Sequence, residues 1–168
     1  MPIIQKVALC DIDIIEKDGE FEATEVNKRT VPAMLTNYSI EVGHRMGLLK
    51  GSLNADLINV MAAYVEHGGS LETPANGKAQ DIPVEALRSL EGILDDTKVT
   101  SVIYLGCIGA NRNFELSYDD FLTQYNADTS ERLQTYFSLI TALKSNDKAA
   151  FAKEFKAKTS SKTDSKKK

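Results

Sequence analysis

One stretch constrains the fold more than any other, and it runs VTSVIYLGCIGANRNFELSYDDFLTQY from Val99 to Tyr125. An apolar run meets a Gly-Ala-Asn turn at Gly109, and a second amphipathic segment begins at Ser117. Asp120 follows Ser117 by three residues, a spacing typical of a helix start, where side-chain oxygens accept hydrogen bonds from unpaired backbone N–H groups. We therefore expect a helix to begin at Ser117, directly after a turn that closes the apolar run.

The apolar run itself fits two kinds of secondary structure. Its β-branched residues favour a strand. Its spacing also marks one face of a helix, formed by Val99, Val102, Ile103, Gly106 and Cys107. We interpret the run as a buried helix that begins between Asp95 and Thr97 and ends near Gly109.

The first 30 residues have the pattern of a β-hairpin. Asp18 and Gly19 form a strong two-residue turn signal, because both tolerate the positive φ of a type I′ turn. The apolar residues before the turn share one parity, which predicts that they face a core: Ile4, Ala8, Cys10, Ile12 and Ile14. Asp11 and Asp13 would then face solvent. Since two strands alone are only marginally stable, the hairpin should pack on helices or pair with another chain.

The chain from 31 to 157 has helical periodicity. Thr30 and Pro32 predict the first helix start, and its apolar positions are Val31, Leu35, Tyr38, Val42, Met46 and Leu49. Gly51 should end that helix and Ser52 should cap the next one, whose stripe includes Leu57, Met61 and Tyr64. Later helices are expected after Asp81, after Asp128 and near 146–156.

These elements define the expected fold class. We predict an α+β, predominantly α-helical protein with a single domain over 1–157. It consists of a β-hairpin (1–30) and a compact set of about six helices (31–157). Residues 158–168 are rich in Ser and Lys and should form a disordered tail.

Charge is distributed unevenly along the chain. Lys156–Lys168 holds six lysines and one aspartate, so this end carries +5 while the whole chain carries −4. The rest of the chain is therefore at −9, which argues against nucleic acid as the main partner because phosphate binding needs clustered cations. No apolar run approaches the ~20 residues of a membrane span, so no membrane partner is expected.

Residues that could carry chemistry are few and scattered. His44 and His67 are the only histidines and lie on different predicted segments, and Cys10 and Cys107 are isolated in apolar surroundings. A zinc site needs about four convergent ligands, which these residues do not offer. The glycines after the central apolar run lack most of a dinucleotide fingerprint. We predict no catalytic, cofactor-binding or metal-binding residue, and we expect a protein that is not an enzyme.

Three segments resemble the tail assembly chaperones of long-tailed bacteriophages and prophages. They are VIYLGCIGANRNFELSYDDFLTQY, the later LQTYFSLITAL and the earlier LLKGSLNADLINVMAAYVEH. The family pattern falls on Gly106, Gly109, Asn111, Ser117, Tyr118, Asp119, Asp120 and Phe121. The resemblance implies an N-terminal β segment followed by a compact set of helices.

The resemblance also implies a function. Proteins of this family are not enzymes; they coat the tape measure protein while the tail tube protein polymerises, and they are absent from the finished virion. The expected location is the cytoplasm of the bacterial host. We expect the client to dock on the helix with Leu57, Met61 and Tyr64, or on the hairpin edge, which also suits strand pairing into a homo-oligomer.

Two other functions fit the sequence. One is a structural head–tail connector or tail component of a phage, which would be present in purified particles. The other is a small enzyme with an unrecognised site, which would show a deep pocket with converging ionisable groups.

Overall fold

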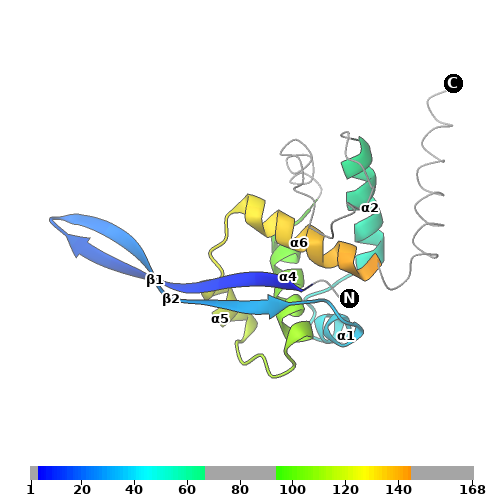
Figure 1. Ribbon diagram of the computed structural model, residues 1–168, viewed down its shortest axis with the longest axis horizontal. Coiled ribbons are helices and arrows are strands. Elements are labelled where there is room, and N and C mark those ends of the chain that lie inside the picture. The colour runs from blue at the N-terminus through cyan, green and yellow to red at the C-terminus, as the bar shows by residue number, and fades with distance from the viewer. Residues whose placement is uncertain (1–3, 67–93, 145–168) are drawn as a thin grey trace.

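The fold combines one β-hairpin with five helices over the residues that the computed structural model describes, 4–66 and 94–144 (Figure 1). The elements are β1 (Gln5–Lys17), β2 (Glu20–Ala33), α1 (Asn37–Arg45), α2 (Leu53–Glu66), α4 (Asp96–Ala110), α5 (Tyr118–Gln124) and α6 (Thr129–Lys144). This confirms the expected α+β class. The helices expected after Asp81 and near 146–156, His67 and the tail at 158–168 lie outside the described residues.

The hairpin is longer than expected. Asp18 and Gly19 have φ angles of 55° and 83°, so both adopt the left-handed conformation that a type I′ turn requires. The strands pair antiparallel from Gln5 opposite Ala33 to Lys17 opposite Glu20. Figure 1 shows that the turn end of the hairpin projects away from the helices, while the other end lies among them.

Helix α4 is the centre of the fold. Every side chain from Val99 to Ile108 is buried, and α4 packs against α1, α5, α6 and β2. A helix enclosed on all sides needs apolar residues around its whole circumference, which explains why its sequence also fitted a strand. The helical interpretation is confirmed, including its start: the Asp95 carboxylate accepts a hydrogen bond from the Thr97 N–H at 2.9 Å.

The two predicted caps after α4 are confirmed. The Ser117 hydroxyl accepts from the Asp120 N–H at 3.1 Å, and the Asp128 carboxylate accepts from the Glu131 N–H at 2.8 Å. These bonds fix the starts of α5 and α6. Phe121 then lies fully buried next to the capped turn.

The first helix starts later than the sequence suggested. β2 continues through Pro32 to Ala33, because a two-stranded sheet offers edge positions where a missing N–H costs no ladder bond. Thr36 caps α1 instead, in a reciprocal capping box with Ser39. The helix ends before Gly47, whose φ of 73° is left-handed. As a result Tyr38 and Met46, expected on a buried stripe, are exposed.

A close backbone approach joins the hairpin to α4. The Met34 N–H, just after β2, donates to the Gly106 carbonyl at 2.8 Å. A Cβ at Gly109 would overlap the Met34 carbonyl oxygen and would meet the Ser39 hydroxyl at 2.9 Å. Only glycine therefore fits this contact, which fixes one end of the hairpin on the central helix.

Candidate partner-binding arm

A β-bulge divides the hairpin into two parts. The register passes from Leu9 opposite Arg29 to Asp11 opposite Val26, so two β2 residues, Asn27 and Lys28, lie opposite Cys10 alone. Asn27 adopts φ 53°, as the first residue of such a bulge often does. We call residues 5–9 and 29–33 the base, and residues 11–26 the arm.

In the base, the side chains of β1 that face the core are the odd-numbered ones, whereas the even-numbered ones were predicted to do so. Val7 and Leu9 are each 1% exposed, whereas Ile4, Ile12 and Ile14 are exposed. Ala8 is also exposed and Cys10 is half-buried. The prediction was wrong because β1 carries apolar residues on both faces, so alternation alone could not tell which face meets the helices. The face expected to be core is the solvent face.

The arm gathers exposed apolar side chains on one face. Cross-strand pairing places Ile14 opposite Ala23, with Ile12 opposite Glu25 on one side of that pair and Phe21 opposite Glu16 on the other. We call Ile12, Ile14, Phe21 and Ala23 the apolar arm face. Ile14 is 68% exposed and Phe21 is 77% exposed. Burying such a side chain is worth roughly 1.5–3 kcal/mol, so this face could contribute substantially to binding.

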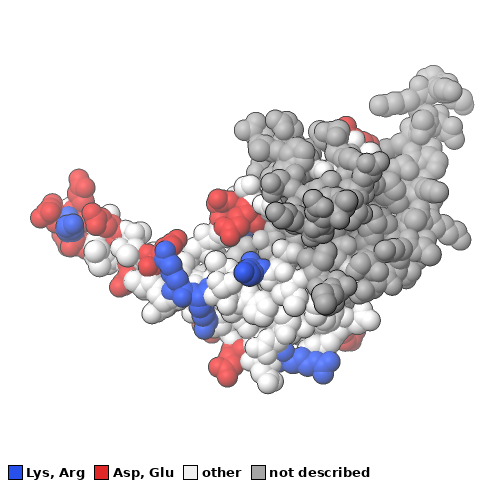
Figure 2. All heavy atoms as spheres, viewed as in Figure 1, with Lys and Arg blue, Asp and Glu red and all other residues white. Residues whose placement is uncertain are grey.

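The arm that carries this face is strongly acidic. The arm holds seven carboxylates and one lysine, a net charge of −6: Asp11, Asp13, Glu16, Lys17, Asp18, Glu20, Glu22 and Glu25. Figure 2 shows acidic side chains along the arm, with several of them gathered at its far end. The arm therefore combines an apolar face, on which Glu16 and Glu25 also lie, with a net negative charge.

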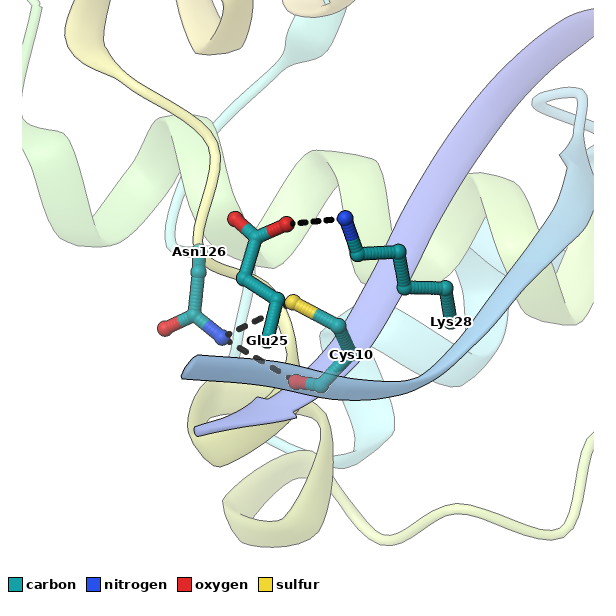
Figure 3. A network of polar contacts seen from close by, with 4 residues as sticks. All are labelled: Cys10, Glu25, Lys28 and Asn126. Atoms are coloured by element: carbon teal, nitrogen blue, oxygen red, sulfur yellow. Dashed lines mark hydrogen bonds and ion pairs between the residues drawn. The ribbon is translucent and has the colours of Figure 1, made fainter. Parts of the chain in front are cut away.

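Polar contacts fix the arm where it leaves the base (Figure 3). The Asn126 side-chain amide, from the α5–α6 connection, donates to the Cys10 carbonyl at 3.1 Å and lies 3.6 Å from its sulfur. Lys28 and Glu25 form an exposed ion pair at 2.8 Å, and this contact raises the pKa of Lys28. A recess of about 400 Å³ opens beside these residues. The contacts with Asn126 hold the root of the arm on the helical body.

The helix predicted to bind the client is α2, and its apolar stripe is buried in the core. Leu57, Met61 and Tyr64 are 1%, 4% and 5% exposed, and the Tyr64 ring lies 5.7 Å from that of Phe137 on α6. They are buried because α2 packs against α6 through this stripe. The expectation that these three residues form an exposed docking face is therefore corrected. The hairpin edge, the other expected place, belongs to the exposed arm.

The remaining candidate residues are separate from one another. His44 is exposed, with Nδ1 3.1 Å from the Leu49 carbonyl oxygen, and Cys107 is buried in α4. Across 4–66 and 94–144, no three His, Cys, Asp or Glu side chains are grouped to hold a metal ion. The same part of the chain contains no helix long and apolar enough to cross a membrane. Comparisons with protein-family models, curated proteins and solved structures found no match.

The two cysteines should differ sharply in reactivity. Burial raises the pKa of the Cys107 thiol to about 12, and the thiolate is the reactive form. Cys10 is partly accessible at the root of the arm. We expect a disulfide reagent at pH 8 to modify one thiol in the native protein and two in denaturant. Rapid modification of two native thiols would contradict the burial of Cys107, and a Cys10→Ser variant identifies the reacting group.

Proposed function

We propose that this protein is a phage tail assembly chaperone that acts by binding and is not an enzyme. The observation that carries the proposal is the apolar arm face, where Ile14 and Phe21 project into solvent from a fixed root. An isolated two-stranded ribbon gains little stability from such side chains while they stay exposed. Their placement supports a surface kept for a partner.

The resemblance of the central segments to tail assembly chaperones supplies the identity of the partners. In this proposal the client is the tape measure protein, and binding protects its apolar segments while the tail tube protein polymerises around it. The chaperone would act in the cytoplasm of the bacterial host and leave before the virion is complete. The arm would cover apolar client side chains that otherwise aggregate.

Co-expression with a tape measure protein tests this function. We expect the client to be largely insoluble alone, and soluble and co-purified when the chaperone is present. A matched control is the same co-expression with the chaperone lacking residues 11–26, its two strands joined by a short glycine turn. Equal client solubility with and without the intact chaperone would contradict the proposal.

Purified phage particles separate the proposal from the structural alternative. A chaperone should be missing from particles whose tails are complete, whereas a head–tail connector or tail component should be present in a fixed ratio to the tail tube protein. Quantitative mass spectrometry of particles and of the lysate measures both. A stoichiometric amount in the particle would favour the structural component.

A further inference from the structure

Geometry and charge limit the kind of partner segment that could cover the apolar arm face. Ile12, Ile14 and Phe21 lie on the face of the ribbon, so a strand added at either edge would leave them exposed. A segment that lies across the face would cover them. The base of the same hairpin shows this mode, because α4 packs against β2 and α6 packs against β1 there.

The charge of the arm selects among possible occupants. Seven carboxylates against one lysine make a second arm an unfavourable partner, because two such arms would bring like charges together. Glu16 and Glu25 lie on the apolar face itself, opposite Phe21 and Ile12. A partner with Lys or Arg beside its apolar residues would meet these carboxylates with opposite charge.

We propose that the apolar arm face binds an amphipathic helix whose apolar stripe is flanked by Lys and Arg. This inference rests on the proposed function and names the chemistry of the client segment. The apolar stripe would cover Ile14 and Phe21, and the flanking cations would reach Glu16 and Glu25 on the same face. In this mode of recognition the partner helix binds through apolar side chains that recur every three or four residues.

The test uses two synthetic helical peptides and the full-length protein. Both peptides have the same leucine stripe over about three heptads; one has Lys and the other Glu at the flanking positions. Fluorescence anisotropy should show the Lys peptide binding at least about tenfold more tightly, a difference of ~1.4 kcal/mol. The preference should shrink between roughly 0.1 M and 1 M salt, as the screening length falls from ~10 Å to ~3 Å.

Charge-reversed variants locate the binding to the arm. Glu16→Lys with Glu25→Lys reverses the two charges on the apolar arm face and should abolish or invert the preference. Glu41→Lys with Glu115→Lys makes the same charge change at exposed positions on the helical body and should retain it. Phe21→Thr should weaken binding of both peptides. Equal affinity for the two peptides, or a preference that survives reversal of the arm charges, would overturn the proposal.

Three further outcomes separate this inference from the alternatives and from the proposed function. Sedimentation that shows a dimer of the wild type, lost in Phe21→Thr, would identify a second copy as the occupant and overturn the inference. Capture of a tape measure protein without any peptide preference would refute the basic-helix inference alone. A clear preference without capture would refute the proposed function alone.

Discussion

Replacing Phe121 with alanine should lower the free energy of unfolding by ~3–5 kcal/mol, the usual cost of truncating a buried aromatic. Phe121 is fully buried, stacks on Tyr125 at 5.1 Å and lies 5.3 Å from the Tyr104 ring of the central helix. The truncation leaves a cavity between α4 and α5, which the capped start of α5 cannot close. Urea denaturation measures the change.

Leu122→Ala is the matched control for this substitution. Leu122 follows Phe121 on the same helix but is 44% exposed. Surface substitutions usually change stability by less than ~0.5 kcal/mol. Similar losses for the two variants, or a nearly unchanged Phe121→Ala protein, would contradict the position of Phe121 in the core.

Gly109→Ala should destabilise the protein by about 3 kcal/mol, the upper end of the usual cost of overpacking. The new methyl group would overlap the Met34 carbonyl oxygen, which is backbone and cannot rotate away as a side chain would. Relief requires α4 and the end of β2 to separate, which weakens the Met34–Gly106 hydrogen bond. The thermal midpoint should therefore fall.

Gly51→Ala provides the comparison. A Cβ at Gly51 meets no atom within 4 Å, and its φ is not in the left-handed region. Removing glycine there should be neutral, or stabilising by ~0.4–1 kcal/mol through the unfolded chain. A Gly109→Ala protein as stable as Gly51→Ala would show that β2 and α4 do not approach so closely.

Local chemistry made much of the fold predictable. The Asp18–Gly19 turn and the caps at Asp95, Ser117 and Asp128 each depend on a few adjacent residues, and each lies where the sequence placed it. The start of α1 was missed because Pro32 fits both a first helical turn and an edge strand. Which of the two holds depends on the pairing of Pro32 with distant Lys6.

The candidate site was harder to predict because burial depends on tertiary packing. Two sets of residues have apolar patterns in the sequence. One is the helical stripe of Leu57, Met61 and Tyr64, and the other is the alternating pair Ile12 and Ile14. Contact of α2 with α6 buries the first set, while the bulge and the projection of the arm leave the second exposed. Neither packing event leaves a local signal in the sequence.

The central claim, that the apolar arm face is a binding surface and not part of the core, is tested most directly by Ile14→Thr combined with Phe21→Thr. Threonine keeps β propensity and charge while removing apolar surface. The experiment measures co-purification of the tape measure protein with each variant, which we call capture, and the thermal midpoint of the same variant. The control is Ile15→Thr, on the opposite face of the arm. Capture should be lost at an unchanged midpoint in the double variant and retained in the control. Unchanged capture, or a midpoint that falls by many degrees, would contradict the claim.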